Sequence, residues 1–131
     1  MTVKRVSSKT LRFVQPEVVR LSLSNDDWID VRKELSTGEA RRAMAKTIKS
    51  MRSDGRIEPD IEMVGRAEIA AYLIDWSFTD ANDKRVACSD ASLDNLTQPA
   101  YAEIEAAVRQ HIAAVEEERG KATSGNSLRA V

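Results

Sequence analysis

The strongest pattern in this sequence is a long apolar stripe in its last third. Its members recur every three or four residues and are Tyr101, Ile104, Val108, Ile112 and Val115. This spacing predicts an amphipathic α-helix, because residues at i, i+3, i+4 and i+7 share one helix face. Pro99 predicts the first turn of this helix, and Gly120 predicts its end.

A second pattern, strict alternation, predicts a β-strand near the N-terminus. In residues 17–24 one side of the strand would hold Val19, Leu21 and Leu23. Alternation with a period of two is typical of a half-buried strand. Residues 24–27 are turn and helix N-cap types. A short helix is predicted after them, because apolar residues recur at i, i+3 and i+7: Trp28, Val31 and Leu35.

Two further helices are predicted between residues 36 and 76. Ser36 and Glu39 have the spacing of a capping box, and the stripe that follows is Ala40, Met44, Thr47, Ile48 and Met51. This helix would stop at Asp54-Gly55. The next would open at Pro59, with the stripe Ile61, Val64, Ile69, Tyr72, Leu73 and Trp76. Gly65 inside it costs roughly 1 kcal/mol relative to Ala, so a close helix contact is expected there.

After Trp76 the pattern becomes extended. Residues 76–79 and 84–88 flank an Asp/Asn turn, which predicts a β-hairpin, and residues 89–96 have room for one helical turn. The fold class predicted is α+β and mostly helical, with four or so helices and a small antiparallel sheet made of the N-terminal strand plus the hairpin. The 131 residues suit one domain. We expect a flexible basic arm (1–15), a single globular α+β domain (16–119) and a disordered tail (120–131).

The reactive side chains give little support to catalysis or metal binding. Cys88 and His111 are the only residues of their kinds, whereas a zinc site needs four ligands at short spacings. A Cys–His nucleophile would need these two to meet in space. Asp26, Asp27 and Asp30 lack the alternating ligands and the glycine of a calcium loop, and helix capping explains them better. We therefore expect no enzyme, no cofactor and no metal.

The cysteine count and the length of the apolar runs bear on the cellular compartment and on membrane association. A single cysteine excludes an internal disulfide and fits a reducing compartment. No apolar run approaches the roughly 20 residues that cross a bilayer. No secretory apolar region follows the basic first residues. The product is therefore expected in the cytosol, without a membrane partner.

Charge is uneven along the chain, although the formal net charge is only −1. A candidate basic docking face lies in residues 36–56: Arg41, Arg42, Lys46, Lys49 and Arg52. Residues 57–100 carry an excess of acids. Unlike charges on one small domain suit self-association or docking between unlike surfaces, while two solvated helix faces are the simpler interpretation. The sequence pI of about 5.9 and the lack of stacking aromatics disfavour nucleic-acid binding.

The segment from Trp76 to His111 also carries a likeness to a known family. Its order is a helix ending in a tryptophan, a strand, an Asp/Asn turn, a returning strand, two leucines and a closing helix. The residues are Leu73 to Asp80, Val86, Leu93, Leu96, Pro99 and Tyr101. This order resembles the tail assembly chaperones of long-tailed bacteriophages. Residues 27–39 also resemble the start of such proteins, and the likeness spans about residues 17–119.

The resemblance implies a non-enzymatic adaptor that binds the tape measure protein and the tail tube protein during assembly in the host cytoplasm. It would then be absent from the mature virion. In such families a frameshifted longer product often exists, which the tail from residue 121 would suit. The candidate interface or core anchors are Trp28, Trp76, Leu93 and Leu96. The alternatives are a structural virion component, such as a minor tail or connector protein, and a small nucleic-acid-binding regulator; homo-oligomer formation stays open.

Overall fold

The structure, a computed structural model, describes residues 12–51, 55, 57–59 and 61–129. The helices are α1 (Thr37–Ala45), α2 (Ile61–Tyr72), α3 (Asp90–Asp94) and α4 (Gln98–Arg129). The strands are β1 (Val18–Ser22), β2 (Trp28–Arg32), β3 (Ile48–Met51), β4 (Ile57–Pro59) and β5 (Leu73–Trp76). The predicted α+β class, with four helices and a small antiparallel sheet, is confirmed.

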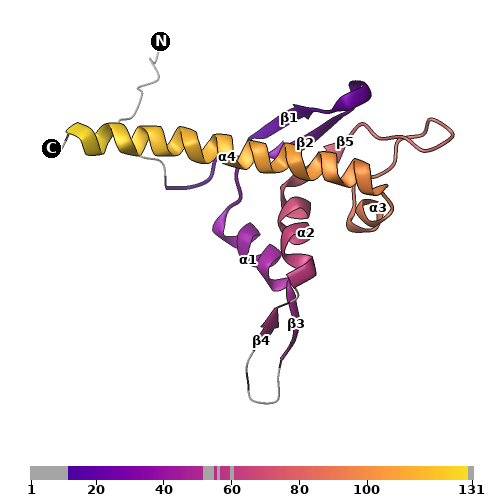
Figure 1. Cartoon of the computed structure of the whole chain (residues 1–131), viewed down its shortest axis with the longest axis horizontal. Helices are drawn as coiled ribbons and strands as arrows, with labels where there is room; N and C mark the ends of the chain where they lie inside the picture. Colours follow the sequence, from indigo (N-terminus) through magenta and orange to yellow (C-terminus); the bar gives the residue numbers. More distant parts are fainter. Residues whose placement is uncertain (1–11, 52–54, 56, 60, 130–131) are drawn as a thin grey trace, which may run out of the picture.

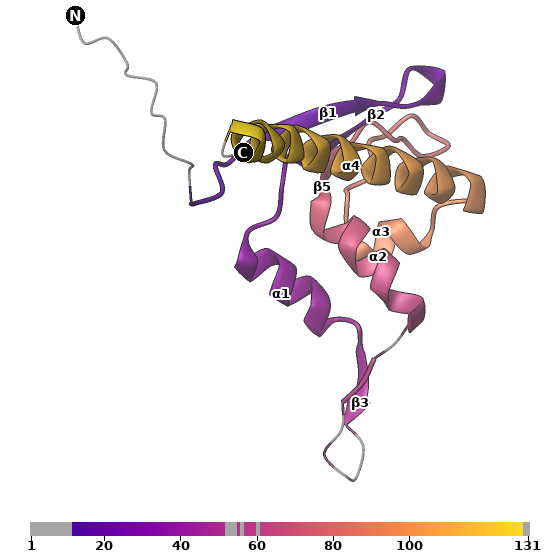
Figure 2. The ribbon, with the colours of Figure 1, turned by 60° about the vertical axis from the view of Figure 1, so that its left-hand side comes forward.

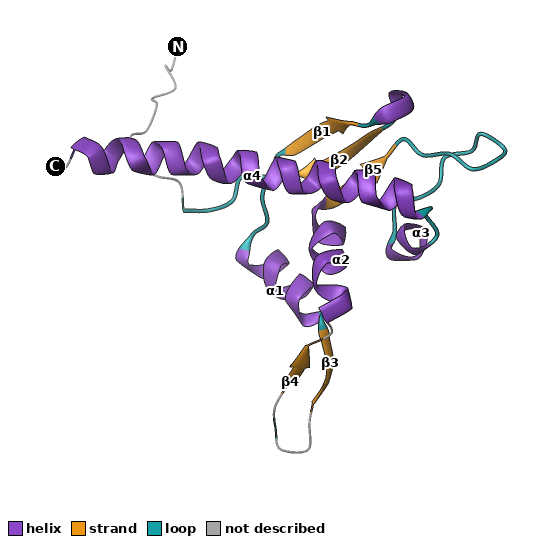
Figure 3. Ribbon diagram, in the orientation of Figure 1, coloured by secondary structure: helices purple, strands orange, loops and turns teal. Residues whose placement is uncertain are grey.

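The elements are arranged around the long helix α4. It crosses the three-stranded sheet, with α1 and α2 beneath it (Figure 1). The β3–β4 hairpin projects from the far end of α1 and α2 (Figure 3). The second half of α4 extends past the sheet, as the rotated view also shows (Figure 2).

The main sheet has the order β1-β2-β5, and both pairings are antiparallel. The alternation predicted in β1 is confirmed, since Val19 and Leu21 pack against the core. The short helix predicted over residues 28–35 is wrong, because Trp28–Arg32 is strand β2 and no helix follows it before α1. Ile29 and Val31 are fully buried there, at 0% exposure. The segment follows this alternation and not the helical spacing of Trp28, Val31 and Leu35, because β2 is the central strand and pairs with β1 on one edge and β5 on the other.

Residues 24–27 are a hairpin turn and not a helix N-cap. The backbone N–H of Leu23 donates to Asp27 O at 2.8 Å, and that of Asp27 donates to Ser24 O at 3.1 Å. Asn25 has φ 57° and ψ 33°, and Asp26 has φ 62°. Positive φ at both central residues defines the type I′ turn, whose twist matches that of the two strands.

Helix α1 begins as predicted but ends early. The capping box is confirmed: Glu39 N–H donates to Ser36 Oγ (3.1 Å), and Ser36 N–H donates to Glu39 Oε1 (2.9 Å). The helix ends at Ala45, so its predicted extension to Asp54-Gly55 is wrong. The β-branched pair Thr47 and Ile48 leaves the helix, and Ile48 opens β3. Gly55, at φ 85°, lies between the paired strands β3 and β4 instead of stopping a helix.

Helix α2 also ends earlier than predicted. It stops at Tyr72, and Leu73–Trp76 becomes the edge strand β5, in which Trp76 pairs with Ile29 of β2. The hairpin predicted after Trp76 is present as a single bridge between Thr79 and Arg85. The predicted helical turn in residues 89–96 is confirmed as α3, capped by the Ser89 hydroxyl.

Helix α4 begins as predicted and runs further than predicted. The Thr97 hydroxyl caps it by accepting from the Ala100 N–H at 3.2 Å. The helix passes through Gly120 and continues to Arg129, so the end predicted at Gly120 is wrong. A glycine inside a helix costs only about 1 kcal/mol, which need not stop it. The division into arm, domain and tail stays a prediction, and residues 1–11 of the arm lie outside the described residues.

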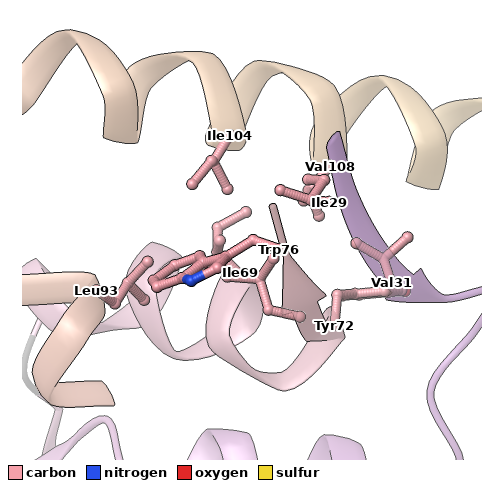
Figure 4. Close-up of a cluster of buried hydrophobic side chains, with 9 residues drawn as sticks. Ile29, Val31, Ile69, Tyr72, Trp76, Leu93, Ile104 and Val108 are labelled. Atoms are coloured by element: carbon pink, nitrogen blue, oxygen red, sulfur yellow. The ribbon is translucent and has the colours of Figure 1, made fainter. Parts of the chain in front are cut away.

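The core is one cluster in which β2 and β5 meet α2, α3 and α4 (Figure 4). Its members are Ile29, Val31, Ile69, Tyr72, Leu73, Trp76, Leu93, Ile104 and Val108. Trp76 is 1% exposed, and its indole Nε1 donates to Val86 O at 2.7 Å. The ring also packs against Phe78, with the two centroids 5.1 Å apart. The core therefore lies between one face of the sheet and the helices, which leaves the other face of the sheet outside it.

Candidate docking surfaces

The four candidate anchors divide into core and surface residues. Trp76 and Leu93 are buried, at 1% and 4% exposure, and Leu96 is partly buried against the same cluster. Trp76 and Leu93 therefore stabilise the fold and offer little area to a partner, whereas Leu96 also lines a surface hollow near the start of α4. Trp28 differs from all three, because it is partly exposed and lies on the side of β2 opposite Ile29 and Val31. Among the four, Trp28 is the one that lies outside the core cluster.

Trp28 is held between two arginines on the outer side of the sheet. The guanidinium carbon of Arg20 lies 3.6 Å from the ring centroid, and that of Arg85 lies 5.3 Å from it. Arg20 Nε is 2.8 Å from Asp30 Oδ1, and Arg85 Nη1 is 3.6 Å from Asp75 Oδ2. We refer to this surface as the open sheet face; it comprises Val18, Arg20, Trp28, Asp30, Ile74, Asp75 and Arg85.

The ion pair between Arg20 and Asp30 shifts the pKa of both groups. The hydrogen bond from Arg20 lowers the pKa of Asp30, and the hydrogen bond to Asp30 raises the pKa of Arg20. The sequence pattern did not reveal this cluster. Arg20, Trp28 and Arg85 come from three separate segments, which only the strand register and the 79–85 bridge bring together.

The helix that was predicted to carry the candidate basic docking face is shorter than its five cations require. Arg41, Arg42 and Lys46 are exposed, the first two on α1 and the third just after it. Lys49 lies in strand β3, and Arg52 lies outside the described residues. Because α1 ends at Ala45, the helical spacing that grouped these residues does not continue. Lys46 Nζ also lies 3.6 Å from Asp90 Oδ2, so one cation already has an acidic neighbour.

A small apolar groove lies between α1 and α2. It has a volume of about 170 Å³ and is lined by Leu35, Ala40, Ala43, Met44, Thr47, Val64, Ala67 and Glu68. We call it the α1–α2 groove. Ala43 and Ala67 are buried on its two helices, while Met44 is 62% exposed and Val64 is 43% exposed. Ile48, just beyond α1, is 45% exposed. The predicted stripes placed these three larger residues inside, so the sequence did not indicate the groove.

His111 has a structural place in the fold. It is 8% exposed, and its Nε2 donates to Lys33 O at 2.9 Å and lies 3.2 Å from Arg32 O. Its ring meets Tyr72 edge to face, with centroids 6.2 Å apart. The histidine therefore ties α4 to the end of β2.

Cys88 is half-buried, and its thiol is a poor nucleophile at neutral pH. Burial first, and then the charges of Asp75 and Asp90, raise the pKa of Cys88 to about 11. Within the described part of the chain, no three His, Cys, Asp or Glu side chains are grouped so as to hold a metal ion. Among the same residues, no helix is long and apolar enough to cross a membrane.

A hollow of about 730 Å³ lies where the β1–β2 turn meets the start of α4. Its charged lining residues are Asp27 and Glu103. Both carboxylates are engaged in the fold: Glu103 accepts from Ser24 N–H at 2.8 Å and from Ser24 Oγ at 3.1 Å, and Asp27 Oδ1 accepts from Ser77 Oγ at 2.8 Å. These hydrogen bonds hold the turn against α4 through Glu103 and against the segment after β5 through Asp27.

No family model, no curated protein and no solved structure matches this chain.

Proposed function

We propose that this chain is a non-enzymatic tail assembly chaperone, an adaptor that binds the tape measure protein and recruits tail tube subunits in the host cytoplasm. The observation that supports it best is the α1–α2 groove. Two of the six exposed large hydrophobic residues of the described chain, Met44 and Val64, line this groove, and the exposed Ile48 directly follows the lining residue Thr47 in the sequence. Their gathering at one place is typical of a protein-binding surface.

The shape and chemistry of the groove suit a helix as the bound element. Two helices form its walls, and an amphipathic helix binds such a groove through apolar residues spaced at i, i+3, i+4 and i+7. Met44 on the rim adds an unbranched, adaptable side chain, which helps a surface accept varied apolar partners. A tape measure protein is long, helical and apolar, and it would aggregate before tube subunits cover it. A groove of this kind would shield short stretches of it, one copy of the adaptor per stretch.

The state of the reactive groups supports a role without chemistry. His111 is held by backbone carbonyls, and Cys88 has a raised pKa. We expect the purified chain to show neither hydrolytic nor metal-dependent activity in general substrate screens.

Co-expression tests the proposal directly. The tape measure protein encoded beside this chain's gene would be produced with and without the chain, and its soluble fraction measured. We expect the chain to raise this fraction and to co-purify with the tape measure protein. A tape measure protein that stays insoluble while the chain purifies alone would contradict the proposal.

Mass spectrometry of purified phage particles gives a second readout. An assembly chaperone leaves the tail before it is complete, so we expect no peptides of this chain in intact particles. Stoichiometric amounts in the particle would instead identify a structural tail component and overturn the assembly-only role.

A further inference from the structure

A hollow of about 470 Å³ lies at the end of the open sheet face that is nearer to α1. Three separate parts of the chain line it: the segment that leads into β1, the region from the end of β2 to α1, and strand β5. We call it the β1–α1 hollow; its lining includes Val14, Pro16, Val18, Arg32, Arg42 and Ile74. Its volume is within the range of roughly 300–1000 Å³ that is typical of binding sites. The hollow is therefore large enough to hold a few side chains of a partner.

The apolar part of the β1–α1 hollow is exposed to solvent, although its residues are large. Val18 is 56% exposed and Ile74 is 40% exposed. Val14 lines the same hollow, and its neighbour in the sequence, Phe13, is 85% exposed. Three of the six exposed large hydrophobic residues of the described chain therefore line this hollow or directly adjoin a lining residue in the sequence. Apolar area that gathers in this way is typical of an interaction surface.

The acidic side chains that line the hollow already have cations as partners. Arg32 Nε lies 2.6 Å from Glu39 Oε2, and Lys33 Nζ lies 3.3 Å from Glu17 Oε2. The third acid, Glu34, pairs with Arg119. These carboxylates are therefore neutralised by groups of the fold itself.

Arg42 is the cation of the hollow that lacks such a partner. Within the part of the chain that the structure describes, no ion pair engages its guanidinium. A Cβ at Gly38 would lie 3.3 Å from Arg42 Nη1, so the guanidinium lies over the first turn of α1, where a glycine leaves room for it. Arg42 also lines an adjoining hollow of about 320 Å³ together with Lys46. An unpaired cation therefore lies beside the exposed apolar side chains.

We propose that the β1–α1 hollow binds a short segment of a partner protein in which a large apolar side chain lies next to a carboxylate. The apolar side chain packs against Val18 and Ile74, and the carboxylate pairs with Arg42. Burial of apolar area supplies most of the affinity, because an exposed ion pair contributes little by itself. The ion pair determines which segments bind, since a segment with the wrong sign of charge is repelled.

The charges around the hollow favour a single carboxylate over a polyanion. Glu17, Glu34 and Glu39 lie around Arg42 in the lining, so they would repel the successive phosphates of a nucleic acid. None of the described lining residues is aromatic, so a base would find no ring on which to stack. A basic segment would bring a second cation to Arg42, and an uncharged one would leave Arg42 without a partner. An acidic apolar segment satisfies both parts of the hollow.

This site goes beyond the proposed function and does not depend on it. The β1–α1 hollow and the α1–α2 groove share no described lining residue. A hollow of this size covers much less area than a standard interface of about 800 Å² per partner. We therefore expect weak binding, with a dissociation constant in the micromolar range or above.

Fluorescence anisotropy with labelled octapeptides tests the proposal, with the full chain titrated from about 1 µM to about 1 mM. The first peptide set carries leucine or phenylalanine flanked by aspartate or glutamate. The second set has lysine in place of the acids, and the third has alanine in place of the large apolar residue. We expect the first set to bind at least about tenfold more tightly than either of the others. Equal binding of all three sets, or no binding of the first set in this range, would overturn the proposal.

Variants of the chain locate the site. Arg42→Glu should weaken binding of the acidic apolar set by about tenfold or more and make the lysine set the better ligand, because it reverses the charge. The double variant Val18→Thr, Ile74→Thr should weaken binding by about tenfold while it keeps β-branched residues in both strands. Arg41→Glu on the same helix and Met44→Ser in the α1–α2 groove are the matched controls and should bind like the unaltered chain. Equal losses in the controls would overturn the assignment to this hollow.

Other occupants would give different results. If Arg42→Glu loses the native circular dichroism spectrum, Arg42→Gln replaces it and should remove the preference for acidic over lysine peptides. A labelled thymidine oligonucleotide that binds through Arg42 more tightly than the acidic apolar set would identify a nucleic-acid site. A dimer of the unaltered chain in sedimentation velocity that Arg42→Glu abolishes would identify a second copy as the occupant. Either result would overturn the proposal.

Discussion

At the scale of single residues, one position of the β1–β2 turn holds a residue type that its backbone conformation disfavours. This residue is Asp26. Asp26 has φ 62°, a left-handed conformation that glycine adopts without cost. Type I′ turns favour Asn-Gly, whereas this turn has Asn25-Asp26.

We therefore expect Asp26→Gly to raise the free energy of unfolding by about 0.5–1 kcal/mol, which chemical denaturation would measure. Asp26→Ala is the matched control and should destabilise, because alanine lacks the local hydrogen bonding that helps aspartate in this conformation. A glycine variant less stable than the unaltered chain would contradict the type I′ turn.

Gly65 gives a second residue-scale prediction, and here the structure changes the expectation. The sequence indicated a close helix contact, but a Cβ at this position would meet only the ends of two flexible side chains, at 3.4 Å from Arg109 Nη2 and 4.0 Å from Glu105 Oε2. These distances are ordinary contacts with flexible groups. Gly65→Ala should therefore stabilise α2, by up to about 1 kcal/mol. A loss of stability, measured by thermal unfolding, would show that the backbones of α2 and α4 approach more closely.

Two carboxylates also predict how stability depends on pH. The hydrogen bond from Arg20 lowers the pKa of Asp30. The Ser36 N–H, aided by its hydroxyl and by Arg32, lowers the pKa of Glu39. Since both pKa values are lower in the folded chain than in the unfolded chain, the unfolded chain binds more protons in acid. Their contribution is complete above the ordinary carboxyl range near pH 4 and is lost as pH falls through the folded pKa values.

Urea unfolding at neutral pH and near pH 3 measures this effect. The midpoint should fall in acid for the unaltered chain and fall less for the double variant Asp30→Asn, Glu39→Gln. Identical losses in both proteins would show that other groups control the acid response.

At the scale of elements, the start of a helix was easier to predict from the sequence than its end. The capping box of Ser36 and Glu39 predicted the start of α1 from local sequence alone. Ser89 and Thr97 cap α3 and α4 in a similar way. Helix ends were less predictable. Trp76 fits the apolar face of a continued α2, but the open edge of β2 draws this segment into the sheet. Pairing between distant segments has no local signal.

The strand β2 illustrates the same limit. Trp28, Val31 and Leu35 have helical spacing, while Ile29 and Val31 have strand spacing. Only the presence of β1 on one side and β5 on the other decides between these patterns. The strand in turn determines which side of the sheet Trp28 occupies. The open sheet face therefore could not be predicted until the register was known.

At the scale of the whole molecule, the α+β class and the core were within reach of sequence analysis. The aliphatic stripe of α4 follows from periodicity, and Ile104 and Val108 are fully buried on it. The sequence left Trp76 and Leu93 open between core and interface, and the structure places both in the core. The α1–α2 groove and the open sheet face could not be predicted from the sequence. The groove depends on small residues in the contact between two helices, and the open sheet face depends on the strand register. Ala43 and Ala67 let α1 and α2 approach, which leaves Met44 and Val64 on the rim of the groove.

The central claim is that the α1–α2 groove holds the tape measure protein in solution, and a variant of Val64 tests it most directly. Val64 is 43% exposed, so Val64→Glu should cost at most about 1 kcal/mol of stability while placing a charge in the groove. Ala106→Glu, on the exposed side of α4, is the matched control. The measurement is the soluble fraction of co-expressed tape measure protein. We expect Val64→Glu to abolish the gain in solubility and Ala106→Glu to keep it. Equal solubility with both variants would contradict the claim.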